Sequence, residues 1–442
     1  MSPPGQAVRS SLADWRTFGG APPYRRFRTI GLGAAGVTSL ADLGLTIPLL
    51  LTLGTPPALA TLIGVLPIAG SAAQLAVPGL LRRTDGNLRG VTLAIMAAGE
   101  TRGLWLALVT LATATHVIPT AAGILLIAGV TTLAGAATTI GGANLLAWYG
   151  AILPEPERRF VAPRVMGMTL GLGALLLLPA ALLVQLLSPS IGILVYALVF
   201  LVGGLAGVTE LRAIAQLARP GRVRVAPRRT TFAPDPDLRR FVRIVTVAAF
   251  GSGFGPYLSI YAISVLHQPA SFAIVLSALG AAASLITSTI VGGWLAGGSS
   301  SRLLRVSFLL RGGAMLLGLL AFPANPVSGL VLCLVSVVVS AGGASGTIAA
   351  NERLLRLVGR DELFVAQGRY VAGTAGGTTV GQVLNAGLLA VTPLGYLPFA
   401  ALFLVSGVTR FVTAWRVDVS PTWASATAAW RPEDLGGPDR AA

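Results

Sequence analysis

The feature that most constrains this chain is a series of long apolar runs, which recur from residue 29 to residue 415. One of them, GALLLLPAALLVQLL (173–187), contains no charged residue. A helix of about 20 apolar residues spans a bilayer, whereas a membrane β-barrel requires strands in which polar and apolar residues alternate. Only 11% of the 442 residues are charged, against about 25% in soluble domains. The sequence therefore predicts an all-α integral membrane protein.

The apolar runs predict twelve transmembrane helices, and the connections between them predict their direction. The connections alternate between turns that contain proline but no arginine and loops that are rich in arginine. Because positively charged connections stay in the cytoplasm, we expect the proline-bearing turns outside and both termini inside. The predicted spans are 29–53, 57–81, 90–114, 118–143, 163–187, 190–212, 243–266, 271–296, 303–323, 326–349, 366–391 and 395–416.

These spans predict two six-helix bundles joined by a long internal loop. We expect a cytoplasmic N-terminal tail (1–28), an N-terminal bundle (29–212), a cytoplasmic linker (213–242), a C-terminal bundle (243–416) and a cytoplasmic C-terminal tail (417–442). The linker is rich in arginine and proline, and we interpret it as a solvated segment that sets the topology. Contact with anionic lipid headgroups is the alternative.

The net charge of +16 comes from arginines in short loops beside apolar spans, and the chain contains no lysine. This distribution favours the lipid bilayer, and not a nucleic acid, as the partner of the basic residues. The abundance of alanine, glycine, proline and arginine is typical of a high-GC bacterial genome. We therefore expect a multi-pass protein of a bacterial cytoplasmic (inner) membrane.

The two halves of the sequence repeat each other. The string AGAATTIGGAN (134–144) in the fourth span resembles AGGASGTIAAN (341–351) in the tenth, and FVAPR (160–164) corresponds to FVAQGR (364–369). A similar offset aligns Arg102 of the third span with Arg311 of the ninth. Matches at nearly one offset predict duplicated, pseudo-symmetric six-helix halves.

Charged residues inside spans need an explanation, because an arginine at a helix centre costs about 2.5–3.5 kcal/mol on insertion scales. Since Arg102 and Arg311 occupy corresponding positions, we interpret both as structural. Glu100 has no acidic counterpart in the ninth span, where Leu309 stands. On one continuous helix Glu100 and Arg102 would point about 200° apart, so they are not expected to pair with each other.

Twelve spans in two halves, internal termini and a long central loop resemble the major facilitator superfamily. The loop GLLRRTDGNLRG (79–90) is similar to the family motif between spans two and three, and PEPERRF (154–160) is similar to the segment after span four. Where the motif has aspartate this chain has Arg83, with Asp85 two residues later. The resemblance implies two bundles that rock about a central cavity, with the third and ninth spans, and hence Glu100, Arg102 and Arg311, at the periphery.

Two signals common in drug–proton antiporters of that family are missing. The fourth span has no charged residue, and the fifth span reads GMTLGLGALLLLP (167–179), with no Gly-Pro pair. Both differences weaken an assignment to proton-driven drug export. The glycines of the fifth span are interpreted as close helix packing.

Asp42 is the best candidate for proton coupling, because intramembrane acids are functional by default. It lies deep in the first span, and Thr38, Asp42 and Thr46 would share one face of a continuous helix. A carboxyl group there could bind and release a proton as the cavity alternates between the two sides. The alternative is a buried acid that is paired with an arginine or held by hydroxyl groups.

Other polar residues within spans are candidates for the substrate cavity. Tyr257 and Tyr261 lie one turn apart next to a proline that interrupts the helix, which suits a gate or an aromatic contact. Gln382 and Asn385 are one turn apart in the eleventh span, and Gln74 is a weaker candidate of the same kind. Core packing or an interfacial ring is the alternative for the two tyrosines, and hydrogen bonds that tie helices together are the alternative for the amide residues.

The rest of the expected cavity has few charges, so the sequence favours a neutral or amphipathic substrate. We expect a secondary transporter that works by alternating access, with proton-coupled export of a small compound. Import by a symporter or uniporter is the alternative, and a transport-inactive, receptor-like membrane protein is a more distant one. The expected partners are protons, a small-molecule substrate and lipid, and the protein is expected to be a monomer.

A membrane-embedded enzyme requires clustered acids, histidines or an activated nucleophile. The two histidines lie in outer turns of opposite halves, and Cys333 has no basic neighbour in sequence. A phosphate-binding loop of the G-x-x-x-x-G-K-[ST] type requires a lysine. The sequence therefore predicts no enzymatic activity, no cofactor and no metal site.

Overall fold

The structure is a computed structural model that describes residues 18–153, 155–219, 236–255, 257–295, 300–357 and 363–417. Every transmembrane segment in it is helical. The N-terminal half contains η1 (Pro22–Tyr24), α2 (Arg25–Leu40), α3 (Leu43–Thr52), α4 (Pro57–Gly70), η2 (Ser71–Ala76), α5 (Val77–Arg83), α6 (Leu88–Glu100), α7 (Arg102–Ala114), α8 (Thr120–Ile152), α9 (Glu155–Ile191) and α10 (Leu194–Ala215).

The C-terminal half repeats this series with fewer breaks. It contains α11 (Pro236–Phe254), α12 (Leu258–Ser264), α13 (Ala270–Leu295), α14 (Ser300–Leu317), η3 (Gly318–Leu320), α15 (Ser328–Leu357), α16 (Leu363–Val391) and α17 (Tyr396–Arg416). Within the described residues, eleven segments are long and apolar enough to cross a membrane. Helix α16, with 29 residues, lies beside them and supplies the twelfth span, although its middle is rich in glycine and threonine.

Several spans are interrupted, and for all of them but the seventh the sequence predicted continuous helices. The first span consists of α2 and α3, the third of α6 and α7, and the seventh of α11 and α12, while η2 interrupts the second. A break in a buried helix leaves backbone carbonyl and N–H groups without their helical partners. In a membrane such breaks persist only where protein supplies other partners, so they mark places with a specific local structure.

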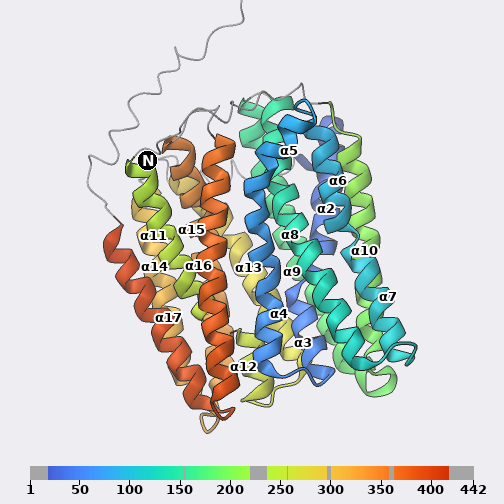
Figure 1. The fold of residues 1–442 in the computed structure, drawn as a ribbon, viewed down its shortest axis with the longest axis vertical. Helices are drawn as coiled ribbons and strands as arrows, with labels where there is room; N and C mark the ends of the chain where they lie inside the picture. The colour runs from blue at the N-terminus through green and yellow to red at the C-terminus, as the bar shows by residue number, and fades with distance from the viewer. Residues whose placement is uncertain are drawn as a thin grey trace, which may run out of the picture.

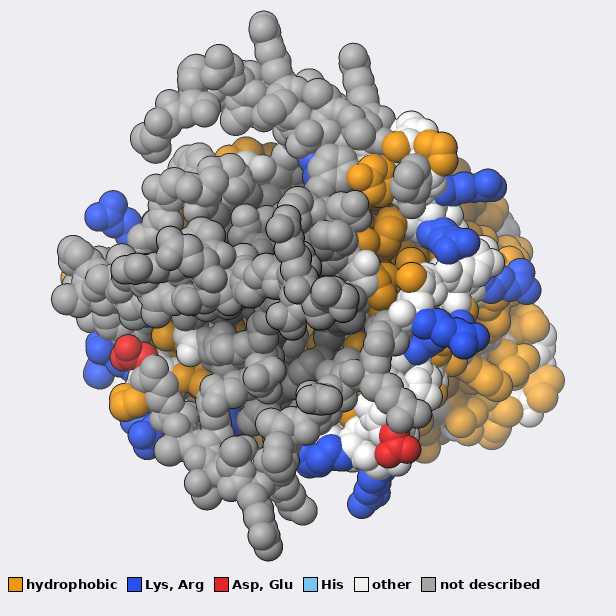
Figure 2. Space-filling model, turned by 90° about the horizontal axis from the view of Figure 1, so that it is seen from above, with side chains coloured by type: hydrophobic (Ala, Val, Ile, Leu, Met, Phe, Trp, Pro, Cys, Tyr) orange, Lys and Arg blue, Asp and Glu red, His pale blue; other side chains and the backbone are white. Residues whose placement is uncertain are grey.

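The helices form two groups that lie side by side (Figure 1), with α2 to α10 on one side and α11 and α14 to α17 on the other. The halves touch where α9 packs on α13, where α4 and η2 pack on α16, and where α3 packs on α12 and α13. Both ends of the described chain lie at the upper end of Figure 1, with the arginine-bearing connections. Figure 2 shows basic side chains around this end, which the arginine bias places in the cytoplasm.

The outer surface of the bundle is apolar, as the bilayer requires. Leucine side chains such as Leu125 and Leu133 on α8 are each 73% exposed, and Leu330 on α15 is 71% exposed. The buried core includes a cluster in which Ile47 and Ala60 from the N-terminal half join Tyr261 and Phe399 of the C-terminal half. The two bundles are therefore in direct apolar contact beside the central region.

Candidate transport site

Asp42 lies at the break in the first span. Helix α2 ends at Leu40, and Asp42 occupies the N-cap position of α3 with extended backbone angles (φ −125°, ψ −178°). Its backbone carbonyl accepts hydrogen bonds from the N–H groups of Leu45 and Thr46, both at 3.0 Å. Aspartate is one of the strongest N-cap residues, which explains why the second half of the span begins here. The side chain caps nothing and is exposed.

The break changes the expected arrangement around Asp42. Thr38 and Thr46 were expected to share a helix face with Asp42, but they lie on different helices on either side of the break. The Thr38 hydroxyl donates to the Ala34 carbonyl at 2.6 Å, and the Thr46 hydroxyl donates to the Asp42 carbonyl at 3.0 Å. Thr46 is also fully buried. Both hydroxyls are thus engaged by nearby backbone, in the case of Thr46 by the backbone of Asp42 itself.

Arg102 holds the end of α2 just before Asp42. Its Nε donates to the Ala41 carbonyl at 2.7 Å, and one Nη donates to the Val37 carbonyl at 3.2 Å. The other Nη donates to the Thr138 hydroxyl on α8 at 2.6 Å. Arg102 is only 4% exposed. A guanidinium is suited to this task because its fixed fork of donors can satisfy several orphaned carbonyls at a helix end.

Two buried carboxyl groups accompany Arg102. Glu100 on α6 and Glu210 on α10 are 1% and 4% exposed, and their side chains are within hydrogen-bonding reach of each other and interact with the Arg102 charge. Because α6 ends at Glu100 and α7 begins at Arg102, the expected angle of a continuous helix between these two residues does not apply. These residues form a buried cluster of one arginine and two acids.

Glu210 was missed by the sequence interpretation. Its signal was present in TELRA (209–213), where an acid ends a long apolar run. Glycine makes the close packing possible, because a Cβ atom at Gly33 of α2 would lie 2.5 Å from the Glu210 Cβ. A Cβ atom at Gly207 would likewise overlap the Glu100 carbonyl oxygen. Helices α2, α6 and α10 therefore meet nearly backbone to backbone around the cluster.

A cavity of about 360 Å³ lies between the halves, next to the α2–α3 break. Leu43, Gly44 and Ile47 of α3 line one side, and helices α12, α13 and α15 supply the remaining residues. The C-terminal wall is rich in hydroxyl groups, and it contains no charged side chain among the described residues. Its serines are Ser259, Ser277, Ser284, Ser336 and Ser340.

Tyr257 is the predicted cavity residue that the structure places in this wall. Its ring comes close to α4, because a Cβ atom at Gly64 would lie 2.8 Å from the Tyr257 hydroxyl oxygen. The Asp42 carboxylate is close enough to interact electrostatically with that hydroxyl. Within the described residues the hydroxyl has no hydrogen-bond partner. Asp42 and Tyr257 therefore bring an acid of one half to a phenol of the other.

Tyr261, by contrast, lies in the core. It is fully buried, donates its hydroxyl hydrogen to the Ala321 carbonyl, and packs its ring on Phe399 and Phe403 at centroid distances of 4.8 and 5.6 Å. These contacts match the alternative of core packing and leave no surface for a substrate.

The amide candidates are buried between helices. Asn385 is fully buried and donates to the Gly255 carbonyl at 3.1 Å, directly where α11 has ended, and to the Gln382 side chain at 3.4 Å. Pro256, which was expected to break this span, lies outside the described residues. Gln74 is 2% exposed on η2, with its side-chain oxygen unpartnered among the described residues. Asn385 thus donates a hydrogen bond to a backbone carbonyl at the break in the seventh span, as Arg102 does at the break in the first.

Arg311 occupies a related position in the C-terminal half. One Nη donates to the Ser252 hydroxyl on α11 at 3.0 Å, close to where α11 ends. Arg410 on α17, which the sequence interpretation missed, is 2% exposed and donates to the Arg311 carbonyl at 3.3 Å. The corresponding arginines of both halves therefore support the inner half-helix of a broken span.

Comparisons with known proteins support the fold through structure alone. No protein-family model and no curated sequence matches the chain. Among solved structures, a D-xylose–proton symporter is 12% identical with a TM-score of 0.65, covering 88% of this chain and 95% of its own. The inward-facing structure of a bacterial homologue of the iron transporter ferroportin is 15% identical with a TM-score of 0.63, covering 91% and 99%.

A mutant form of the nucleoside transporter NupG is also 15% identical, with a TM-score of 0.57 over 91% of this chain and 98% of its own. At these identities the likeness shows the fold and no more. The chain has the fold of the major facilitator superfamily transporters, as its spans, its internal repeat and its loop motifs predicted.

Proposed function

We propose that this protein is a proton-coupled secondary transporter of a small uncharged compound, with Asp42 as the proton carrier. The observation that carries the proposal is the position of Asp42, an exposed carboxyl group at a mid-span helix break, next to a cavity that both halves line. Within the described residues the other acids deep inside spans, Glu100 and Glu210, are buried in helix packing away from this cavity.

The contacts between the halves support alternating access. Helix α3 of the N-terminal half packs on α12 and α13 of the C-terminal half, so any rocking of one bundle against the other must separate or tighten this contact. Asp42 begins α3, and Tyr257 directly precedes α12. A change in the charge of Asp42 therefore acts at the contact that has to move. This arrangement lets proton binding bias one arrangement of the halves over the other.

The cavity wall favours an uncharged substrate that forms hydrogen bonds. Serine hydroxyls both donate and accept, and none of the lining side chains that the structure describes is charged. A volume of about 360 Å³ is at the small end of the range of roughly 300–1,000 Å³ for ligand sites. Two of the similar structures are transporters of a nucleoside and of xylose, which are uncharged compounds rich in hydroxyl groups. We expect a solute of that general chemistry.

The direction that the sequence favoured is export, because the expected cavity was apolar. Proton antiport remains the first candidate through Asp42, and uptake by proton symport is the second. The observation that keeps uptake as a candidate is the hydroxyl-rich wall, which differs from the apolar cavity on which the expectation of export rested.

The test uses the full-length protein in liposomes that contain a pH-sensitive dye. A panel of uncharged sugars, nucleosides and amphipathic compounds is screened for proton movement triggered by the substrate, in the wild type, in Asp42→Asn and in Asp85→Asn. Asp85 is an exposed acid in the loop between spans two and three and serves as the matched control. The sign of the pH change distinguishes antiport from symport.

We expect substrate-triggered proton movement in the wild type and in Asp85→Asn but not in Asp42→Asn, which should still exchange labelled substrate. Equal proton movement in all three proteins would refute the role of Asp42 but not transport. Substrate movement without protons in the wild type would refute proton coupling and indicate a uniporter or another coupling ion.

A further inference from the structure

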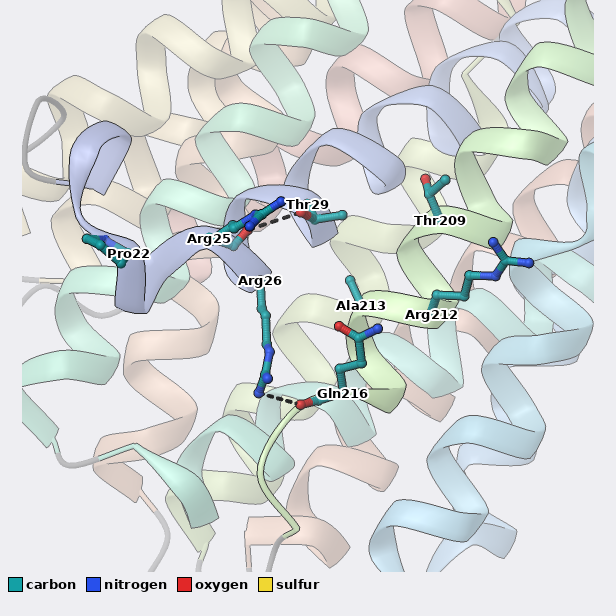
Figure 3. Close-up of a pocket in the computed structure, with 8 residues that line it drawn as sticks. All are labelled: Pro22, Arg25, Arg26, Thr29, Thr209, Arg212, Ala213 and Gln216. Atoms are coloured by element: carbon teal, nitrogen blue, oxygen red, sulfur yellow. Dashed lines mark hydrogen bonds between the residues drawn. The ribbon is translucent and has the colours of Figure 1, made fainter.

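A second cavity lies away from Asp42. It has a volume of about 840 Å³ and lies at the cytoplasmic end of the N-terminal half, between the first turn of α2 and the last turns of α10 (Figure 3). Its polar lining consists of Arg25, Arg26, Thr29, Thr209, Arg212 and Gln216. No role in alternating access accounts for a cavity here, because both helices belong to the same bundle.

The charge of this cavity is positive and uncompensated. Arg26 is oriented by a 2.7 Å hydrogen bond from its guanidinium to the Gln216 carbonyl, as Figure 3 shows. Arg25 and Arg212 are exposed, and within the described residues neither has an acidic partner. The N-terminus of α2 lies at the same cavity, so the positive end of its dipole adds to the field. The cavity therefore has the electrostatic character of an anion site.

The depth of the cavity favours an anion that belongs to the membrane. Arg25 begins the first span and Ala215 ends the sixth, so the arginines lie at the level of the inner headgroups. Below Thr209 the same face of α10 continues with Leu205, Val202 and Leu198, which are 55%, 55% and 54% exposed. On α2 the face of Arg25 and Thr29 continues with Leu32, which is 51% exposed. An apolar track thus leads along α10 toward the middle of the bilayer, and Leu32 of α2 is exposed one turn from the basic cavity.

We propose that this cavity binds the phosphate of an anionic phospholipid from the inner leaflet, with the acyl chains lying along the exposed leucines of α2 and α10. Arginine suits this ligand, because its planar fork matches phosphate oxygens in bidentate geometry. Basic pockets between transmembrane helices on the cytoplasmic side are a known form of lipid recognition. A free phosphate would use the arginines but not the apolar track, whereas a phospholipid uses both.

The lipid would hold the ends of two helices that matter elsewhere in the protein. Helix α2 runs from this cavity to the break at Asp42, and α10 carries Glu210, which lies one residue beyond Thr209 of the cavity wall. A phosphate bridged by Arg25 and Arg212 would fix α2 against α10 at their cytoplasmic ends. The inference does not depend on the identity of the transported substrate.

The experiment measures lipid binding to the full-length protein in detergent by native mass spectrometry, with phosphatidylglycerol and phosphatidylcholine as the two probes. The test variant is Arg25→Gln/Arg212→Gln, and the matched control is Arg82→Gln/Arg83→Gln, which removes two exposed arginines from another inner loop. All four side chains are exposed, so both variants should fold, which their thermal unfolding and size-exclusion profiles check. A competition arm adds inorganic phosphate or glycerol 3-phosphate.

We expect the wild type to bind phosphatidylglycerol in preference to phosphatidylcholine, and soluble phosphates not to compete at millimolar concentration. The Arg25/Arg212 variant should bind phosphatidylglycerol roughly 30-fold more weakly, since one basic residue near an anionic surface contributes about fivefold. The control variant should keep the wild-type affinity. Equal weakening in both variants, equal binding of the two lipids, or displacement by free phosphate would each overturn the proposal.

Discussion

Replacement of Arg102 by glutamine tests whether the first span is broken because a buried arginine supports it. The substitution removes the guanidinium that donates to the carbonyls of Ala41 and Val37 and to the Thr138 hydroxyl. In membrane proteins a hydrogen bond between helices contributes about 0.6 kcal/mol on average, so three bonds give a lower bound of about 2 kcal/mol. Removal of one member of a buried ion cluster costs about 3–5 kcal/mol, because it leaves uncompensated charge. We expect a loss of unfolding free energy between these limits.

The free energy can be measured by reversible unfolding of the full-length protein in mixed micelles of increasing denaturing detergent. Arg102→Lys keeps the charge but loses the fork of donors, so its loss should lie near the lower bound. Arg82→Gln, at an exposed position, should lose less than about 0.5 kcal/mol and serves as the control. If Arg102→Gln lost no more than this control, the guanidinium would not be supporting the end of α2.

A double substitution separates the two contributions. If Arg102 neutralises the carboxyl pair, Glu210→Gln should remove part of the penalty of Arg102→Gln, with a coupling free energy of about 1–3 kcal/mol. Strictly additive losses would show that Glu210 does not share a charge cluster with Arg102, although both are buried.

Two further predictions concern packing and the cavity. Gly207→Ala should destabilise the protein by more than about 1–3 kcal/mol, since its methyl group would overlap the Glu100 carbonyl oxygen. Gly142→Ala, on the open face of α8, is the control and should be neutral or stabilising. Equal effects of the two substitutions in unfolding experiments would contradict the described helix contacts. Tyr261→Phe should cost about 1 kcal/mol of stability and leave transport unchanged, while Tyr257→Phe should raise the KM for substrate in liposomes without loss of stability. The opposite pattern would place Tyr261 in the cavity and Tyr257 in the core.

The span pattern was predictable because it depends on length and apolarity, which are local properties of the sequence. The internal repeat drew attention to Arg102 and Arg311 as related positions, since an arginine within an apolar span is rare enough to be noticed twice. Periodicity alone did not predict the break at Asp42. The preference of aspartate for N-cap positions was available as a signal. Within an apolar run, however, the sequence is equally compatible with a continuous helix and with one that is broken at Asp42. The position of Arg102 beside the carbonyls of α2, which favours the break, is not visible in the sequence.

The composition of the cavity was harder to predict, because it depends on which helix faces meet across the two halves. Ser277 and Ser284 lie two turns apart on α13, and Ser336 and Ser340 lie one turn apart on α15, so each pair forms a polar stripe. Serine is common in helix packing within membranes, and neither stripe is informative until α13 and α15 are known to face α3. Tyr261 was ambiguous for the same reason, since its neighbour Phe399 is distant in sequence.

Both halves use an arginine to hold a broken span, but the charged residues around that arginine differ between the halves. This difference bears on where protons bind. In each half an arginine at the repeated position, Arg102 or Arg311, bonds to or near the inner half-helix of a broken span. In the N-terminal half α10 brings Glu210 to that arginine, whereas in the C-terminal half α17 brings Arg410, a second cation, at a similar depth. The two halves therefore share the arginine at the broken span, but only the N-terminal half has a carboxyl group beside it. Within the described residues the acids deep inside spans, Asp42, Glu100 and Glu210, all belong to the N-terminal half, so proton coupling is expected to act through that half while the serine wall of the C-terminal half contacts the substrate.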